Sequence, residues 1–201
     1  MKVELHSHTM RYSGCAVSTP AQLMVSLIQH QYDAVFLTEH DAVWEDWELN
    51  TLRREYPELR IFPGVELSLP NDDHLLVLGT NDREYLTLRQ PERIIARAQQ
   101  AKHLTVLAHP FRWPKPYSLL ETDSLPDAVE FRTHNSDARA GEQSLTAARH
   151  LRLPLVNAGD THAAQTLGHF WIDTYPDLAS NTDIYDIVRN GMYENAMKKR
   201  R

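Results

Sequence analysis

Short apolar runs alternate with amphipathic stretches along most of the chain. The runs are rich in Val, Leu, Ile and Phe, as is typical of buried strands. They occupy residues 2–8, 33–40, 60–68, 74–80, 104–110, 128–133 and 154–160, with an eighth candidate at 169–175. Between several of them, apolar residues recur at helical spacing. This alternation predicts one α/β domain built on a mostly parallel sheet.

The polar residues at the ends of the amphipathic stretches define four helices. Thr19 can cap the first, and Pro20 can occupy its first turn. The second follows Pro91, and the third runs from about Ser136 to residue 151. The last begins near Thr182 and extends to about residue 201. No G-x-G-x-x-G or Walker loop occurs, which disfavours a nucleotide-binding open sheet and favours a barrel or near-barrel.

Composition narrows the class of protein. The chain has 201 residues, which fits a single domain over 1–201, and its one cysteine rules out a disulfide framework. No apolar run approaches the roughly 20 residues that span a bilayer, and the amino terminus lacks a signal-peptide pattern, so we expect a cytoplasmic protein without a membrane partner. The net charge of −6 argues against broad nucleic-acid binding.

The chain has eleven histidines, and their positions separate them into groups. His30, His103 and His150 each follow a helical pattern, where an imidazole can interact with exposed helix carbonyls. A second group lies at the carboxyl ends of predicted strands, and it consists of His6, His8, His40, His109 and His162. His74 differs because it opens its strand. In barrels and parallel sheets, active sites form at the carboxyl ends of the strands.

Two carboxylates join the strand-end histidines. Glu66 and Asp160 each end a predicted strand, and Asp160 and His162 repeat the i, i+2 spacing of His6 and His8. Burying so many polar groups together without partners would be very costly. Imidazole and carboxylate together suit Zn, Mn or Fe. Because the donors exceed one tetrahedral site, about two or three divalent ions are expected, with Glu66 as a bridge between two of them.

Six segments resemble the successive motifs of the PHP (polymerase and histidinol phosphatase) family of metal-dependent phosphoesterases. They are "ELHSHT", "FLTEHD", "GVELS", "HLLVLG", "LAHPFR" and "NAGDTH", in the family's order between residues 4 and 162. The resemblance implies a distorted TIM-like barrel of seven β/α units with a metal cluster at the carboxyl ends of the strands. The metal ligands that it implies are His6, His8, His40, Glu66, His74, His109, Asp160 and His162.

The chain also departs from the family pattern. Soon after the first motif, where the family supplies Asp or His, only Ser13 and Cys15 are available, so Cys15 is a candidate ligand for the third metal subsite. Before His40 stands Glu39, which we interpret as a carboxylate that orients an imidazole by accepting its other N–H. Glu130 is a candidate for the same role, or for a pairing in the core.

The chemistry expected of this cluster is hydrolysis of a phosphoester in a small phosphorylated metabolite or nucleotide. A metal-bridging hydroxide would be the nucleophile, with Glu66 and Asp160 as catalytic ligands. Arg112 is placed to bind the substrate phosphate, and Arg11 is a second candidate. His134 would contact the substrate or donate a proton to the leaving group. Specificity would reside in the loops at 112–117 and 44–49, where Trp44 and Trp47 are expected to pack on the barrel.

Three alternatives remain open. The protein could be a nuclease that acts on short oligonucleotides, the one form in which nucleic acid is expected as a partner. It could be a non-catalytic metal-binding module, or it could hydrolyse a carbon–nitrogen bond, since amidohydrolase barrels also begin with His-x-His. The last lacks an obvious bridging lysine, because Lys102 precedes its strand and Lys115 lies in a proline-rich loop. The sequence determines neither the substrate, nor which metal binds, nor the oligomeric state.

Overall fold

A computed structural model describes residues 1–114 and 118–198 of the chain. Within these ranges the strands form one nine-stranded sheet. Their bounds are β1 (Lys2–Glu4), β2 (Ala34–Leu37), β3 (Arg60–Ser68), β4 (His74–Leu78), β5 (Leu104–Ala108), β6 (Ala128–Glu130), β7 (Leu155–Val156), β8 (Phe170–Thr174) and β9 (Tyr193–Met197). Each predicted apolar run contains one of these strands. Only β9 lies outside them.

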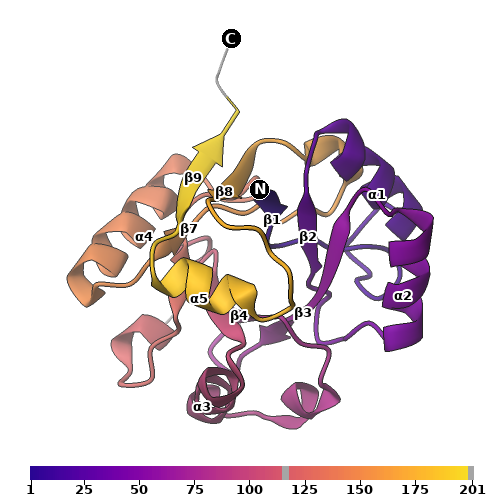
Figure 1. The fold of residues 1–201 in the computed structure, drawn as a ribbon. Coiled ribbons are helices and arrows are strands. Elements are labelled where there is room, and N and C mark those ends of the chain that lie inside the picture. Colours follow the sequence, from indigo (N-terminus) through magenta and orange to yellow (C-terminus); the bar gives the residue numbers. More distant parts are fainter. Residues whose placement is uncertain (115–117, 199–201) are drawn as a thin grey trace.

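The sheet curves into a nearly closed barrel (Figure 1). Its strand order is β7-β6-β5-β4-β3-β2-β1-β8-β9. The two edge strands are linked by side chains, because the Tyr193 hydroxyl and the Asn195 amide both donate to the Leu155 carbonyl. The prediction of a barrel-like α/β fold is therefore confirmed.

The sheet is mixed, which corrects the prediction of a mostly parallel one. β4 is antiparallel to β3 and β5, and β8 is antiparallel to β1 and β9. The cause is connection length. The few residues between Ser68 and His74 can close a hairpin, whereas a parallel crossover needs roughly a dozen residues or more.

Five α-helices accompany these strands in the described ranges (Figure 1). They are α1 (Pro20–Gln29), α2 (Asp46–Glu55), α3 (Pro91–Ala101), α4 (Ala138–Leu151) and α5 (Asp183–Arg189), with 3₁₀ turns at Arg83–Thr87, Leu119–Glu121 and Ala164–Thr166. Thr19 caps α1 in a capping box with Gln22, as the sequence predicts. None of the helices in the described ranges is both long and apolar enough to cross a membrane.

The apolar residues form three clusters. Residues of α1 and α2 pack with Val35 and Leu37 of β2, and residues of α3 and α4 pack with β3, β4 and β5. Ile184, Ile187 and Val188 of α5 pack with the remaining face of the barrel strands. The helices thereby bury both surfaces of the sheet and leave the strand ends to carry polar groups.

Two helix predictions need correction. The last helix ends at Arg189 and does not continue to residue 201, because Gly191 has a positive φ of 66° and β9 follows. Residues 199–201 lie outside the described residues. Helix α2 was not predicted, although Glu45 and Glu48 form a capping box at its start.

Candidate metal centre

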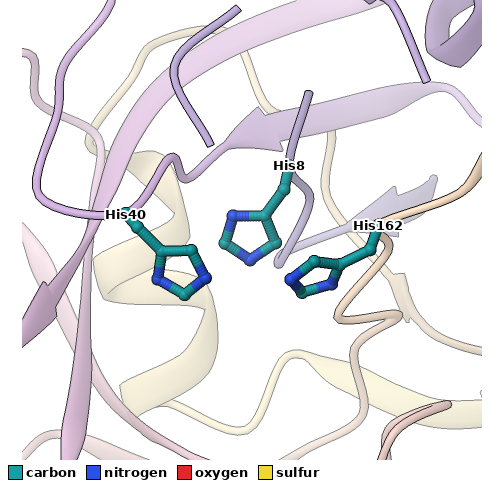
Figure 2. A group of neighbouring side chains, drawn as sticks. All are labelled: His8, His40 and His162. Atoms are coloured by element: carbon teal, nitrogen blue, oxygen red, sulfur yellow. The ribbon is translucent and has the colours of Figure 1, made fainter. Parts of the chain in front are cut away.

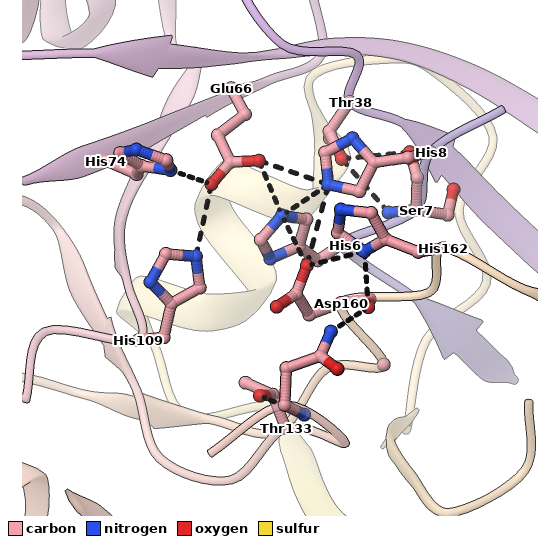
Figure 3. Close-up of polar contacts among 12 residues, drawn as sticks. His6, Ser7, His8, Thr38, Glu66, His74, His109, Thr133, Asp160 and His162 are labelled. Carbon is pink, nitrogen blue, oxygen red and sulfur yellow. Dashed lines mark hydrogen bonds and ion pairs between the residues drawn. The ribbon is translucent and has the colours of Figure 1, made fainter. Parts of the chain in front are cut away.

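One rim of the barrel collects the polar residues singled out in the sequence. The carboxyl ends of the parallel strands β1, β2 and β3 meet there, followed by those of β5, β6 and β7. β4 runs in the opposite direction, so its first residue, His74, lies at the same rim and pairs with Ala108 at the end of β5. The antiparallel direction of β4 explains why His74 opens its strand and still joins the other histidines (Figure 3).

Glu66 lies at the centre of the cluster, and five imidazole nitrogens surround its carboxylate (Figure 3). Its Oε2 lies 2.9 Å from His6 Nε2, 3.1 Å from His8 Nε2 and 3.2 Å from His40 Nδ1. Its Oε1 lies 2.7 Å from His74 Nδ1 and 3.2 Å from His109 Nε2. The two oxygens thus face different sets of imidazoles, which is the arrangement of a bridging carboxylate.

Asp160 provides a second carboxylate beside Glu66. Its Oδ1 lies 3.5 Å from His6 Nε2, 3.6 Å from His8 Nε2 and 3.4 Å from His162 Nδ1. This oxygen is buried and has no hydrogen-bond partner among the described residues. A buried carboxylate oxygen without a donor is costly, so the position favours a cation.

Four overlapping groups of side chains have ligand atoms close enough to share an ion. Three of them combine imidazole with carboxylate, and one consists of His8, His40 and His162 (Figure 2). The other three groups are His6 with His109 and Asp160, His6 with His8 and Glu66, and His40 with Glu66 and His74. All eight metal ligands implied by the family resemblance belong to at least one group, whereas Cys15, the candidate for the third subsite, belongs to none of these groups.

The pKa shifts within the cluster indicate that its carboxylates require positive charge nearby. Burial acts to lower the pKa of His6, but the charges of Glu66, Asp160 and Glu130 outweigh it and raise that pKa well above its ordinary value. Conversely, burial acts to raise the pKa of Glu66, and the surrounding imidazoles hold it well below its ordinary value. The carboxylates therefore stay ionised and attract either protons on the imidazoles or metal ions.

Two imidazoles at the edge of the cluster are prepared to act as neutral ligands. Burial lowers the pKa of His40 to about 4, and burial also lowers the pKa of His162. Both side chains are partly exposed, with 27% and 25% of their surface accessible. Neutral, accessible imidazole is the form that binds Zn, Mn or Fe. The donor set and the unpartnered Asp160 oxygen thus both fit divalent metal ions.

Glu130 forms hydrogen bonds with two of these ligand residues. Its Oε1 lies 2.9 Å from His6 Nδ1, and its Oε2 accepts the backbone N–H of His109 at 2.7 Å. With the Nδ1–H of His6 donated to Glu130, the lone pair of Nε2 faces the cluster. Of the two roles considered for Glu130, its position matches the orienting one.

Glu39 contacts the metal ligand His8 only indirectly, through Ser13, whereas the sequence predicted a direct contact with an imidazole. It is fully buried, and within the described ranges it accepts hydrogen bonds from Thr9, Ser13 and Trp44 rather than from an imidazole. The Ser13 hydroxyl, which donates to Glu39, lies 3.3 Å from His8 Nδ1. The prediction of direct contact with an imidazole is therefore corrected, since the Ser13 hydroxyl stands between them.

Three other predicted residues form no hydrogen bond or ion pair with a side chain of the metal ligands within the described ranges. Cys15 is exposed and joins none of the four groups found among the described residues, and burial raises the pKa of its thiol. The Arg11 guanidinium is held by Glu48, with Nε at 2.8 Å from the carboxylate. His134 is exposed, and its ring contacts that of His169 in a tilted arrangement, with centroids 5.1 Å apart. Cys15 as a ligand therefore gains no support from the four groups, and Arg11 and His134 as substrate contacts stay predictions.

Arg112 lies beside a carboxylate of the cluster. Its Nη1 is 3.3 Å from Asp160 Oδ2, and its guanidinium stacks on Trp113 at 4.3 Å from the ring centroid. Both residues line a cavity of about 370 Å³ beside the cluster, into which residues 110–114 and the start of α4 project. Residues 115–117 of this predicted specificity loop lie outside the described residues. In the second loop Trp44 is buried as expected, whereas Trp47 is 65% exposed, contrary to expectation.

Glu4 is a functional candidate that the sequence analysis missed. It is completely buried, and its Oε1 accepts the backbone N–H groups of His6 at 3.1 Å and Gly159 at 2.6 Å. It therefore joins the segment that carries His6 to the one that carries Asp160. A Cβ at residue 159 would collide with Thr161 and Glu4, so this position requires glycine. The signal in the sequence was a carboxylate inside an otherwise apolar strand.

Comparisons with known proteins support the fold. No protein-family model matches the chain, and no curated protein matches its sequence. Among solved structures, a two-domain protein from Bacteroides vulgatus that contains a predicted PHP-like metal-dependent phosphoesterase superposes with a TM-score of 0.73 at 12% identity. It matches 98% of this chain and 64% of its own. This chain has the PHP-type fold.

Two more structures share the PHP-type fold. The lesion-specific endonuclease PfuEndoQ from Pyrococcus furiosus superposes with a TM-score of 0.71 at 17% identity, over 96% of this chain and 57% of its own. PsfC from Pseudomonas syringae superposes with a TM-score of 0.69 at 20% identity, over 98% of this chain and 91% of its own. This chain thus spans most of PsfC but little more than half of the endonuclease.

Proposed function

We propose that this protein is a metal-dependent hydrolase that cleaves a phosphoester in a small phosphorylated metabolite or nucleotide. The observation that carries the proposal is the buried Glu66 carboxylate with five imidazole nitrogens around its two oxygens. The PHP-type fold supports it, because the strand ends that hold this cluster form the usual site of catalysis in barrels.

The residues that would hold the ions are those of the four ligand groups, with Glu66 shared between two groups. Divalent ions bound there would lower the pKa of a water molecule and stabilise negative charge on the phosphoryl and leaving oxygens. The protein fixes the ligand geometry through buried carboxylates. Glu130 sets the orientation of His6, and Glu4 ties the backbone beside His6 to the backbone beside Asp160.

Arg112 supplies the cation that a phosphoester needs beyond the metal ligands. Asp160 takes one edge of its guanidinium, with Nη1 at 3.3 Å, and Trp113 covers one face. The side chain stays 28% exposed, so its other N–H groups are available to solvent and to a phosphate. A planar fork of donors matches two phosphoryl oxygens, which is why arginine suits this role better than lysine.

The alternatives fit the site less well. A bridging lysine, expected for hydrolysis of a carbon–nitrogen bond, does not occur among the described ion-pair partners of Glu66 and Asp160, which are histidines and Arg112. Lys102 pairs with Asp186 at 3.1 Å, away from the ligands, and Lys115 lies outside the described residues. The net charge of −6 disfavours a nuclease with a long binding track. A metal-binding module without turnover shares the ligand cluster and is separated by experiment.

The test uses protein stripped of metal and reloaded with Mn, Zn or Fe. Phosphate release is then measured with phosphomonoesters, nucleotides and short oligonucleotides, and amide hydrolysis is measured in parallel. The proposal predicts metal-dependent phosphate release from a small phosphoester. Metal uptake without any hydrolysis would instead identify a binding module, and cleavage of oligonucleotides alone would identify a nuclease. His103→Gln serves as the matched control, because His103 lies at the carboxyl end of a helix and bonds Tyr85.

A further inference from the structure

A second cavity, of about 380 Å³, opens at the same rim as the candidate metal centre. Its walls come from the residues after β6, the first turn of α4 and the ends of β8 and β9. β8 runs antiparallel to β1, so its first residue, Phe170, lies beyond the carboxyl end of β1. Met197, at the end of β9, pairs with Phe170. The rim of the barrel therefore carries both the metal ligands and this cavity.

Basic side chains from three separate segments line the cavity. They are Arg132 after β6, His169 before β8 and Lys198 after β9. The backbone N–H of Lys198 donates to the His169 carbonyl at 3.0 Å, which keeps the last two segments together. The hydroxyls of Thr133 and Ser136 add neutral donors to the same wall. Such a mixture of cations and hydroxyls is suited to an anion.

The described residues provide no acidic partner for the two fully charged basic side chains of this cavity. Within the described ranges neither Arg132 nor Lys198 forms an ion pair, and the recorded contact of the Arg132 guanidinium is with the Met197 sulfur at 3.7 Å. Asp137 is the one carboxylate among the described lining residues, and its Oδ1 already caps α4 through Ala140 at 2.8 Å. In a chain of net charge −6, Arg132 and Lys198, which have no counter-ion among the described residues, indicate a binding site for an external anion.

The lowered pKa of His169, which forms a pair with His134, is consistent with a positive potential at the cavity. The rings of His134 and His169 form a tilted pair with centroids 5.1 Å apart. Burial lowers the pKa of His169, and the neighbouring charges of His134 and Lys198 lower it further. His134, which the sequence singled out for contact with the substrate, does not line the cavity itself but contacts His169, which does.

The wall of the cavity also touches the metal centre. The backbone N–H of His134 donates to the Gly159 carbonyl at 3.1 Å, and the Asn135 amide donates to the Asp160 carbonyl at 2.7 Å. The segment 132–137 therefore has the metal ligand Asp160 on one side and the basic cavity on the other.

We propose that this cavity binds a phosphate-type dianion. The dianion is either a second phosphate on a substrate whose reacting phosphate lies at the metal centre, which rests on the proposed function, or a free phosphate or sulfate ion.

The first arm of the test measures binding without turnover. Inorganic sulfate is titrated into the metal-loaded full chain by calorimetry, in the wild type, in Arg132→Gln/Lys198→Gln and in Lys198→Gln alone. The control is Arg54→Gln/Arg149→Gln, two exposed arginines that line none of the described cavities. We expect sulfate affinity to fall about ten-fold or more in the cavity double variant and not in the control, since each charged hydrogen bond carries about that factor. Equal sulfate binding in all four proteins would overturn the proposal.

The second arm separates the two sources of the dianion. Fructose 6-phosphate and fructose 1,6-bisphosphate are compared as inhibitors of p-nitrophenyl phosphate hydrolysis. A stronger effect of the bisphosphate that disappears in the cavity variants assigns the cavity to a substrate phosphate. No advantage of the bisphosphate, together with lost sulfate binding, assigns it to a free dianion. If no variant hydrolyses p-nitrophenyl phosphate, the proposed function is in question, while the sulfate titration still decides the cavity.

Discussion

Two groups of histidines in this chain have opposite surroundings. At the helix ends two of the three imidazoles have a neutral partner: His30 Nδ1 lies 2.9 Å from the Ser26 carbonyl, and His103 Nδ1 lies 2.8 Å from the Tyr85 hydroxyl. At the rim, by contrast, the Nε2 atoms of His6 and His8 face each other at 3.0 Å, and both face Glu66.

The difference shows what each group needs. A helix-end imidazole is satisfied by one neutral hydrogen bond and requires no further ligand. The rim imidazoles and carboxylates cannot satisfy one another without added positive charge, either as protons or as metal ions. Substitutions in the two groups should therefore affect different properties of the protein.

The largest effect is expected from Glu66→Gln. The amide keeps the size of the side chain but removes the charge that five imidazole nitrogens face. Changing a residue that only hydrogen-bonds to a metal ligand typically lowers metal affinity about 10–100-fold. Because Glu66 would itself be a ligand, we expect a larger loss of metal affinity in this variant, together with loss of turnover. Metal content and phosphate release measure this, and circular dichroism checks that the fold persists. Full activity in Glu66→Gln would refute the bridging role.

A smaller loss is expected from Glu130→Gln. One oxygen of Glu130 orients His6 and the other accepts the backbone N–H of His109, so the amide weakens both contacts without removing a ligand. Metal affinity should fall about 10–100-fold, as measured by competition with a chelator. Unchanged affinity would mean that the His6 ring is oriented by its packing alone.

The pH dependence of metal binding is the next test. Despite burial, the carboxylates around His6 raise its pKa and so favour a proton on its imidazole in the metal-free protein, which a bound metal must displace. Affinity should therefore increase with pH, by up to about ten-fold per unit for each displaced proton. His40, with its pKa lowered to about 4, contributes no displaced proton at neutral pH. Calorimetry in buffers of different ionisation enthalpy counts the protons, and a count of zero at neutral pH would contradict this assignment.

The titration of Glu66 and His6 should also make the stability of the metal-free protein depend on pH. Glu66 has a lowered pKa, so its contribution is present above its unfolded value of 4.5 and is lost as the pH falls. His6 has a raised pKa, so its contribution is present below its unfolded value of 6.5 and is lost as the pH rises through the raised value. The melting temperature of the metal-free protein should thus pass through a maximum as the pH is varied. When metal is added, the range of high melting temperature should extend to more alkaline pH.

The smallest effect is expected from His103→Gln in the helix-end group. The change removes one hydrogen bond, to Tyr85, and should cost about 1 kcal/mol of unfolding free energy. Metal content and turnover should match the wild type. Denaturant unfolding and elemental analysis together measure both quantities, and a loss of metal in this variant would erase the distinction between the two groups.

The sequence was sufficient to find most of the rim. Side chains at the carboxyl ends of parallel strands meet at one edge whatever their sequence separation, which is why His6, Glu66 and Asp160 could be grouped in advance. His74 does not follow that rule, because β4 is antiparallel, and only the family resemblance placed it with the ligands.

What the sequence could not give depends on side-chain contacts between distant segments. Nothing local indicates that Ser13 separates Glu39 from His8, or that Arg11 pairs with Glu48. The strand β9 was missed because Glu194 and Asn195 make it polar, and it is an edge strand whose partner β8 supplies the apolar face.

The central claim is that the rim binds more than one divalent cation through Glu66. Elemental analysis of the wild type and Glu66→Gln, each purified without added metal and again after loading with Mn or Zn, tests it most directly. We predict more than one equivalent of divalent metal in the loaded wild type and a clear loss in Glu66→Gln. A loaded wild type that retains no metal would contradict the account.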